Sequence, residues 1–304
     1  MIQFATNQLL QLAKIKFDSG DHSGALLILN GASQSPDVTR LGYEIRYSYG
    51  KYLVARGNYA EAGEQFKACT LGTVPLEIRV LAHERCALLN AIFKGEATPI
   101  SRVTGVHAGA KLQTATDLDV RFLAPEVWFV GSAAAYRSGY DKQWHDNLSR
   151  LIRMVKHDAQ PETLRRLGEL LADFMYTCCT PVLSRADYLV PVPTSPDRWN
   201  ERGYSIPTAL AATVAKMCAI PNYDEILEID GDVPELRRVP RWFRAKAIEG
   251  AYAAKKKPWI EGRSLVIVDD IITTGSTIKE IARTLVDAGA AEVAAISLAH
   301  TERS

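Results

Sequence analysis

The sequence predicts an α/β protein in which an all-α, helical-repeat-like domain precedes a domain with a parallel sheet flanked by helices. Three observations lead to this prediction. The N-terminal third contains few Val and Ile residues and little alternation of apolar and polar residues, which favours helices. From residue 187, short apolar runs alternate with helix-like segments, a pattern typical of parallel α/β sheets. Two segments of the N-terminal third also resemble each other, at an offset close to a helical-repeat period.

The length and composition indicate a globular protein of two domains. A chain of 304 residues corresponds to roughly two domains of about 150 residues, and we place these at residues 1–130 and 131–304. The net charge of +1 argues against a protein that coats DNA over its whole surface. No apolar run approaches the ~18–20 residues of a bilayer span, and the first residues do not resemble a signal peptide. The five cysteines form no CxxC pair, so we expect free thiols and a cytoplasmic protein.

Residues 17–32 and 53–72 follow the same pattern. In each segment a Gly precedes an Ala by five residues, and a bulky apolar residue follows the Ala by four. This spacing resembles the hairpins of tetratricopeptide (TPR) repeats, whose period is about 34 residues, and a plain helical bundle is the alternative that stays open. With either architecture we expect a surface for a protein partner or for self-association. The residues concerned are Gly20, Ala25, Leu29, Gly57, Ala62 and Phe66, and Gly50 is a further small residue that lets two helices approach closely.

The middle of the chain is predicted to pass from a linker into helices. Residues 96–125 contain prolines and glycines without sustained periodicity, which indicates a loop or linker. Helices are expected to resume after this linker, because apolar residues recur at helical spacing from Leu148 to Val155 and from Leu164 to Phe174.

The C-terminal region is predicted to alternate strands with helices. Ser205 is suited to cap the first of these helices, because its side chain can accept a hydrogen bond from a free backbone N–H group. The apolar run at residues 265–268 is typical of a strand buried on both faces of a parallel sheet. The other predicted strands span residues 188–192, 226–229 and 292–298, and the predicted helices span residues 205–218 and 276–288.

The richest chemical pattern follows the strand at residues 265–268. Two adjacent carboxylates, Asp269 and Asp270, end this strand, and a loop of hydroxyl-bearing residues and one glycine leads directly into a helix. Free backbone N–H groups at a helix N-terminus bind phosphate, and hydroxyls add donors without bulk. Because carboxylates would repel a phosphate, we expect them to face ribose hydroxyls or a magnesium ion. The pattern favours a sugar phosphate, and the loop consists of Thr273, Thr274, Gly275, Ser276 and Thr277.

The segment LVIVDDIITTGST, residues 265–277, resembles the loop that binds 5-phosphoribosyl pyrophosphate (PRPP) in type I phosphoribosyltransferases. The resemblance implies the fold of that family, a parallel sheet flanked by helices, for the C-terminal domain. It also implies that Asp269 and Asp270 hold the ribose 2′- and 3′-hydroxyls and that residues 273–277 hold the 5′-phosphate. The implied cofactor is Mg²⁺, which the two carboxylates would contact indirectly, through ribose or water.

A second segment, residues 189–210, resembles the ComF (competence protein) branch of this family. It matches a strand that ends in Pro-Val-Pro and a following loop at Arg198, Arg202 and Gly203, and it departs from the branch at residues 205–207. The resemblance implies that this loop, which also contains Thr194, meets the pyrophosphate. Arg suits such a contact, because its planar guanidinium group bonds two oxygens at once.

A third segment, residues 236–252, resembles the flexible catalytic loop of the family. Arg244 and the run Gly250-Ala251-Tyr252 match this loop, while Ala247 stands where the family has Asn. By this resemblance Arg244 joins Asp269, Asp270 and Arg202 in the set with an implied catalytic role. The resemblance does not extend to the N-terminal third, where typical relatives carry a four-cysteine zinc module.

The resemblance implies that the protein binds PRPP with Mg²⁺ and transfers phosphoribose to a base or similar acceptor, with release of pyrophosphate. Two other functions stay open: a catalytically weak regulatory or effector module that senses PRPP or a nucleotide, and a ComF-like factor that handles single-stranded DNA in DNA uptake or anti-phage defence. Residues 237–263 carry nine basic residues against two acids, with aromatic residues interleaved. This stretch is expected either to bind single-stranded nucleic acid or to divide between the PRPP site and a solvated turn.

Overall fold

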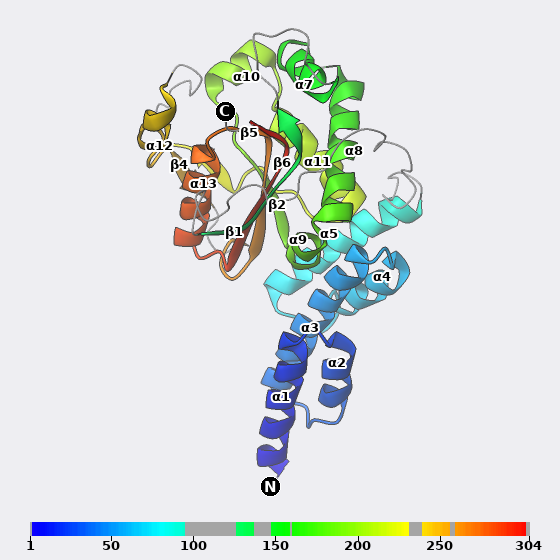
Figure 1. Cartoon of the computed structure of the whole chain (residues 1–304). Helices are drawn as coiled ribbons and strands as arrows, with labels where there is room; N and C mark the ends of the chain where they lie inside the picture. Colours follow the sequence, from blue (N-terminus) through cyan, green and yellow to red (C-terminus); the bar gives the residue numbers. More distant parts are fainter. Residues whose placement is uncertain are drawn as a thin grey trace. The chain divides into compact units, whose positions relative to one another are not determined.

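The computed structural model describes residues 2–94, 126–136, 147–158, 160–230, 239–255 and 259–301 (Figure 1). The chain divides into two compact units. The first comprises Met1–Glu96 with Leu183–Arg185, and the second comprises Ala97–Val182 with Ala186–Ser304. Residue 130, the expected domain boundary, lies inside a strand of the second unit.

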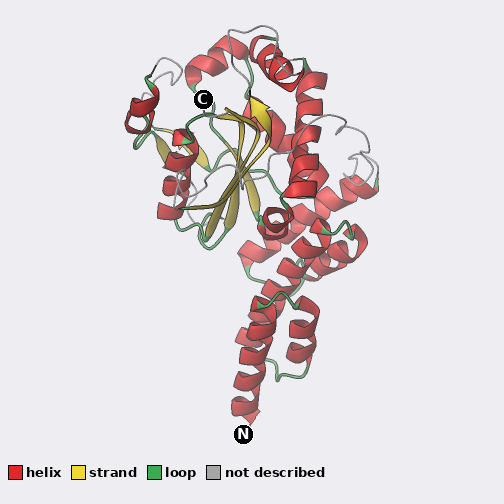
Figure 2. Cartoon of the chain, in the orientation of Figure 1, coloured by secondary structure: helices red, strands yellow, loops and turns green. Residues whose placement is uncertain are grey.

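The first unit consists of helices in the part of it that the structure describes (Figure 2), as the sequence predicted. Its α2 begins where the Asp21 side chain accepts a hydrogen bond from the Gly24 N–H group, and α3 begins at a Ser35 cap followed by proline. The helices are α1 (Ile2–Asp18), α2 (His22–Asn30), α3 (Pro36–Ala55), α4 (Tyr59–Ala68) and α5 (Leu76–Phe93).

The pairs α1–α2 and α3–α4 repeat one local design. Each pair is joined by a turn in which a glycine has a positive φ, 83° at Gly20 and 73° at Gly57. The next helix is capped in both cases, since Asp21 accepts from Gly24 N–H and Asn58 accepts from Glu61 N–H. The repeated sequence pattern therefore corresponds to repeated helical pairs, and the assignment of these pairs to the tetratricopeptide class stays a prediction.

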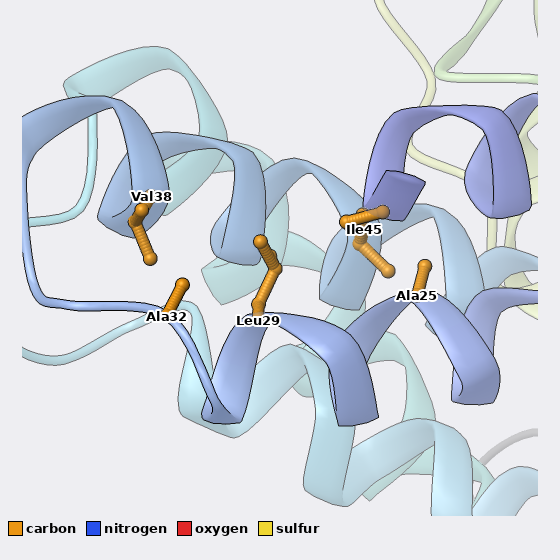
Figure 3. Close-up of a cluster of buried hydrophobic side chains, with 6 residues drawn as sticks. Ala25, Leu29, Ala32, Val38 and Ile45 are labelled. Atoms are coloured by element: carbon orange, nitrogen blue, oxygen red, sulfur yellow. The ribbon is translucent and has the colours of Figure 1, made fainter. Parts of the chain in front are cut away.

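Small and branched apolar side chains fill the space between the first helices. Figure 3 shows Ala25 and Leu29 of α2 facing Val38 and Ile45 of α3, with Ala32 between the two helices. Ala13 of α1 completes this buried cluster. In folded proteins, burial of such apolar side chains stabilises helices more than intrinsic helix propensity does.

Gly50 allows α3 and α4 to pack closely. A Cβ atom at this position would lie 2.5 Å from Cε1 of Phe66, a side chain of α4 that is fully buried. The Phe66 ring is itself confined, because the Tyr47 ring lies 5.6 Å from it and the Arg85 guanidinium lies 5.7 Å from it. The close approach predicted for this small residue is present.

The second unit is built on a four-stranded parallel sheet, which confirms the predicted fold class. The strand order is β1-β6-β5-β2, and every neighbouring pair is parallel. Helices α8 (Pro161–Cys178) and α11 (Ile206–Cys218) pack together on one side of the sheet, and α13 (Ser276–Asp287) lies on the other (Figure 1). The strands are β1 (Val127–Tyr136), β2 (Tyr188–Pro191), β5 (Ser264–Ile272) and β6 (Glu292–Thr301).

The remaining elements of the second unit are a small sheet and several short helices. A two-stranded antiparallel sheet joins β3 (Leu227–Ile229) to β4 (Tyr252–Ala254). The short helices are α7 (Asn147–His157), α9 (Thr180–Arg185), α10 (Pro196–Arg202), the 3-10 helix η3 (Arg241–Phe243) and α12 (Arg244–Ala247). The division of the chain into units passes through α9.

The helices expected from Leu148 to Val155 and from Leu164 to Phe174 are present as α7 and α8, but the sequence analysis missed the edge strand β1 (Val127–Tyr136), which lies before them. In this strand a Cβ atom at Gly131 would lie 3.0 Å from the Phe174 ring of α8. Two further expectations need correction. The strand predicted at residues 226–229 pairs antiparallel with β4 and does not join the parallel sheet. The strand predicted at residues 265–268 extends to Ile272, because β6 continues to pair with it through His300, so Asp269 and Asp270 lie within the strand.

Two expectations about composition can be compared with the structure. Among the described helices, none is long and apolar enough to cross a membrane. All five cysteines are free thiols, and burial raises the pKa of Cys69 to about 12.

Candidate functional site

The loops that follow β2 and β5 meet at one edge of the sheet. These two strands are paired in parallel, from Tyr188 opposite Leu265 to Pro191 opposite Val268, so their carboxyl ends lie side by side. The carboxyl edge of an open parallel sheet is where α/β proteins place their ligands. We call residues 192–205, Asp269, Asp270 and residues 273–277 the carboxyl-edge site.

The loop after β5 presents hydroxyls and backbone N–H groups at the start of α13. Gly275 has a φ of 75° and directly precedes the helix, a conformation that glycine adopts without strain. The hydroxyl oxygens of Thr274 and Ser276 are 2.9 Å apart, and the Thr301 hydroxyl donates to the Thr273 carbonyl oxygen. The Ser276 N–H group donates to Thr274 Oγ1, and the binding of a phosphate by the N–H groups of this first turn stays a prediction.

The side chains of Asp269 and Asp270 each accept a hydrogen bond from the backbone N–H group of the next residue. The Asp270 N–H group donates to Asp269 Oδ1, and the Ile271 N–H group donates to Asp270 Oδ1, both at 2.8 Å. Burial and the neighbouring charge of Asp270 raise the pKa of Asp269 well above its ordinary value. Burial also acts to raise the pKa of Asp270, but Lys156 outweighs this effect and the pKa lies below its ordinary value. As the pH rises, Asp270 therefore loses its proton before Asp269 does, and it carries the negative charge of the pair.

Lys156 is a member of this site that the sequence analysis missed. It lies near the end of α7, and its Nζ atom is 2.7 Å from Oδ2 of Asp270. The Tyr204 hydroxyl donates to the carbonyl oxygen of Val155, which ties the end of α7 to the loop after β2. No local pattern identifies Lys156, because only the tertiary fold brings α7 to the end of β5. The one feature of the sequence that points to Lys156 is its position among other basic residues of an amphipathic helix.

The loop after β2 holds the predicted pyrophosphate residues. The Thr194 hydroxyl donates to Ser205 Oγ at 2.7 Å, and Ser205 accepts from Thr208 N–H, which confirms Ser205 as the cap of α11. Arg198 is exposed on α10. The Nε atom of Arg202, at the end of α10, is buried and has no hydrogen-bond partner among the residues that the structure describes. A buried guanidinium donor without a partner suits a ligand oxygen.

Tyr252 connects the predicted catalytic loop with the carboxyl-edge site. Thr277 of the hydroxyl loop is one of the groups that influence the pKa of the Tyr252 phenol. Burial, and then the charge of Asp269, raise the pKa of Tyr252 to about 12, while the charge of Arg198 acts in the opposite direction. The phenol of Tyr252 thus lies near members of all three predicted segments, although the sequence analysis gave it no role of its own.

Glu280 of α13 forms a hydrogen bond with the end of the predicted catalytic loop. Its Oε1 atom accepts a hydrogen bond of 2.7 Å from the N–H group of Gly250, whose φ is 74°. Arg283, one turn further along α13, donates to both oxygens of Glu280. Burial acts to raise the pKa of Glu280, but the bonds from Arg283 and Gly250 outweigh it and the pKa is lowered. The carboxylate is therefore held ionised as the anchor of the loop.

Arg244, the predicted catalytic residue of that loop, is not connected to the carboxylate pair by any contact among the described residues. Its Nε atom donates to the carbonyl oxygen of Val239 at 3.1 Å, within its own loop. Residues 231–238 and 256–258, which hold part of the predicted basic stretch, lie outside the described residues. Lys255 is described, and it forms an ion pair with Glu228 of β3.

The described residues suit a magnesium ion that the ligand carries rather than one that the protein holds alone. No group of three or more His, Cys, Asp or Glu side chains among them could hold a metal ion. The pair Asp269 and Asp270 supplies two carboxylates, and one of these is already paired with Lys156. Mg²⁺ often keeps several waters and takes its other oxygens from substrate phosphates. The predicted indirect contact is compatible with this donor set.

A hydroxyl-bearing loop at a helix start, two adjacent carboxylates and a loop with two arginines lie at the carboxyl edge of a parallel sheet, an arrangement typical of the phosphoribosyltransferase class. Residues 235–304 match the family model described as the phosphoribosyl transferase domain. This match covers β4, β5, α13 and β6, and it contains the carboxylate pair and the hydroxyl loop.

Comparison with individual proteins shows similarity to a DNA utilization protein and to competence proteins. The DNA utilization protein YhgH of Escherichia coli K12 is 28% identical over 155 residues, 51% of this chain and 67% of the relative. Competence protein F of Haemophilus influenzae is 30% identical over 118 residues, 38% of this chain and 52% of the relative. Competence protein ComFC of Bacillus subtilis is 25% identical over 152 residues, 47% of this chain and 60% of the relative. The C-terminal part of the chain is therefore similar to ComF-like proteins and contains a match to the phosphoribosyl transferase domain, and the matches span about half to two thirds of these relatives.

Proposed function

We propose that the second unit binds PRPP together with Mg²⁺ and transfers the phosphoribosyl group to a base or similar acceptor. The observation that carries this proposal is the position of the Asp269–Asp270 pair directly before the hydroxyl loop at the start of α13. PRPP carries a 5′-phosphate, which suits the helix start, and a diol on the same pentose, which suits the carboxylates. The family match over residues 235–304 supports the same function.

Each part of the carboxyl-edge site has a distinct task in this proposal. Residues 273–277 bind the 5′-phosphate through backbone N–H groups and hydroxyls. Asp269 and Asp270 accept hydrogen bonds from the 2′- and 3′-hydroxyls of ribose, and the charge on Asp270 strengthens its bond. Arg202 and Arg198 face the pyrophosphate, and the unpartnered Nε of Arg202 supports this assignment.

The transfer needs positioning and charge stabilisation more than it needs a nucleophilic side chain. The bond between ribose C1 and the pyrophosphate oxygen breaks, and pyrophosphate leaves with the electron pair. The acceptor forms a new bond to C1 and releases its proton to solvent. The protein holds the diol and the leaving group in place while positive charge develops on the ring. Bound Mg²⁺ would supply further charge neutralisation at the pyrophosphate oxygens.

The first test measures binding and turnover separately. In calorimetry with the full chain we expect PRPP to bind in the presence of Mg²⁺ and to bind more weakly after chelation of the metal with EDTA. With a panel of bases we expect release of pyrophosphate. Binding without release would favour a PRPP-sensing regulatory or effector module, and absence of binding would reject both functions.

A second candidate function is the handling of single-stranded DNA, and exposed aromatic side chains favour it. Trp242 of η3 is 84% exposed and Trp199 of α10 is 52% exposed, and both belong to the second unit. Lys246 lies 6.0 Å from the centre of the Phe243 ring, so cations accompany these rings. Aromatic rings and cations together bind single strands by stacking and by attraction to phosphates. The names of the relatives, a DNA utilization protein and competence proteins, support this candidate.

Replacement of Trp242 by Ala tests this candidate. Loss of one stacked base costs about 1–3 kcal/mol, so we expect affinity for a single-stranded oligonucleotide to fall roughly 5- to 150-fold. The matched control is Leu27→Ala, which removes an exposed apolar side chain of the first unit. Fluorescence anisotropy at low and moderate salt measures both variants. Equal affinity of Trp242→Ala and the unmodified chain, or no binding even at low salt, would reject the candidate.

A further inference from the structure

We propose that Lys156 is a ligand-binding residue that exchanges partners. In the free protein its ammonium group pairs with Asp270, and in the complex it moves to the pyrophosphate group of PRPP and leaves Asp270 to the ribose hydroxyls. This inference rests on the proposed function and deepens it, because it adds to the site a residue from α7, far from the phosphoribosyltransferase motif in the sequence.

The first argument is the geometry of the ion pair. Lys156 Nζ lies 2.7 Å from Asp270 Oδ2, so it occupies one of the oxygens that a ribose hydroxyl would need. Asp270 Oδ1 already accepts the N–H group of Ile271. With the lysine in place, each oxygen of Asp270 already has one partner, so a diol competes with Lys156 for the carboxylate. A ligand that uses Asp270 must therefore displace Lys156 or share the carboxylate with it.

The second argument is the degree of burial. The Lys156 side chain is 26% exposed and that of Asp270 is 17% exposed, so both charges are largely removed from water. Leaving one member of such a pair without a counter-charge is costly. A displaced Lys156 consequently needs another anion within reach, and pyrophosphate is the most highly charged part of PRPP. The flexible four-carbon stem of lysine permits a move of this kind.

The third argument is the attachment of α7. The hydroxyl of Tyr204 donates to the Val155 carbonyl oxygen, one residue before Lys156. Tyr204 itself follows Arg202 and Gly203, at the end of the loop that is proposed to meet pyrophosphate. The backbone of Lys156 is thus tied to the pyrophosphate loop, while its side chain reaches the ribose carboxylates. From this position the ammonium group can form an ion pair either with Asp270 or with the pyrophosphate group of PRPP.

A structural role for Lys156, in which it merely neutralises Asp270, makes a different prediction. In that case its removal would affect every ligand of the site in the same way, since all of them use the same Asp270. In the exchange proposed here, its removal weakens only ligands that carry pyrophosphate. The two roles are therefore separated by comparing PRPP with ribose 5-phosphate, which has the diol and the 5′-phosphate but no pyrophosphate.

The experiment is calorimetry of the full chain with PRPP and Mg²⁺ and, separately, with ribose 5-phosphate. For Lys156→Met we expect PRPP affinity to fall about 10- to 100-fold, the range for loss of a hydrogen bond between charged groups. Ribose 5-phosphate affinity is expected to stay equal or to rise, because Asp270 is released. Lys156→Arg is expected to retain the preference for PRPP. The matched control is Arg150→Met, which removes an exposed cation from the same helix and is expected to bind both ligands normally.

The outcomes separate the inference from the function on which it rests. If the unmodified chain binds PRPP and Lys156→Met binds it equally well, or loses affinity for both ligands alike, the inference is wrong and the proposed function stands. If the unmodified chain binds neither ligand, the proposed function and the inference both fail. Should Lys156→Met not fold, as judged by circular dichroism, Lys156→Gln is the second variant: PRPP affinity is again expected to fall, because glutamine has no charge to pair with pyrophosphate, and ribose 5-phosphate affinity is expected to stay equal, because glutamine can still donate to Asp270.

Discussion

Replacement of Asp270 by Asn is expected to reduce phosphoribosyl transfer about 100- to 1,000-fold, the range for loss of one group that stabilises charge in a transition state. The substitution keeps the shape of the side chain but removes the charge that accepts hydrogen bonds from ribose. It also leaves the largely buried ammonium group of Lys156 without its counter-charge. PRPP affinity is expected to fall about 10- to 150-fold, because a hydrogen bond to a charged group contributes about 1.5–3 kcal/mol. Pyrophosphate release and calorimetry measure the two effects.

Two further variants calibrate this result. Asp269→Asn is expected to have the smaller effect, because the raised pKa of Asp269 leaves the negative charge of the pair mainly on Asp270. Asp287→Asn makes the same chemical change at the exposed end of α13, where the carboxylate pairs with Arg283, and is expected to behave as the unmodified chain does. Equal pyrophosphate release by the unmodified chain and by Asp270→Asn would rule out transfer at this site.

Replacement of Gly50 by Ala is expected to destabilise the first unit by about 1–2 kcal/mol. The new methyl group would lie 2.5 Å from the Phe66 ring, which is fully buried and confined by Tyr47 and Arg85. Overpacking of this kind costs about 1–3 kcal/mol, occasionally more, and exceeds the gain of about 1 kcal/mol that alanine brings to a helix. For a unit of this size, each kcal/mol corresponds to about 4–8 °C in Tm.

The distribution of tryptophan makes the measurement specific. All five tryptophans follow residue 127, so their fluorescence reports the unfolding of the second unit, while the circular dichroism of helices reports both units. We expect Gly50→Ala to lower the transition seen by circular dichroism alone. Gly63→Ala, in α4, is the matched control, because its methyl group would lie 3.9 Å from the nearest atom, on Leu89, and should be neutral or stabilising. A Tm for Gly50→Ala equal to that of Gly63→Ala would contradict the proposed close packing.

The part of the site that could be predicted from the sequence is the part that is local in the chain. Residues 265–277 combine a buried strand, two carboxylates, a glycine with positive φ and the start of a helix, and each of these features follows from its near neighbours. The loop after β2 was predicted for the same reason, together with its Ser205 cap. In such segments the order of residue types determines both the backbone conformation and the chemistry.

The part that could not be predicted depends on tertiary contacts. Lys156 belongs to the site because α7 is tied to Tyr204, and Glu280 anchors Gly250 although the two are distant in sequence. The strand β1 was missed because small residues such as Gly131 and Ala133 give no alternating pattern. Its strand conformation results from pairing with β6 rather than from intrinsic preference.

The strand order of the second unit has a consequence for how the chain is made. β6 follows every other strand in the sequence, yet it is an inner strand that separates β1 from β5. During translation β1 cannot pair with β6 until residues 292–301 have left the ribosome. The helical pairs of the first unit join segments that are close in the chain, so they can form early. We therefore expect the second unit to fold more slowly than the first, and its unpaired β1 to be the segment that most needs protection by chaperones.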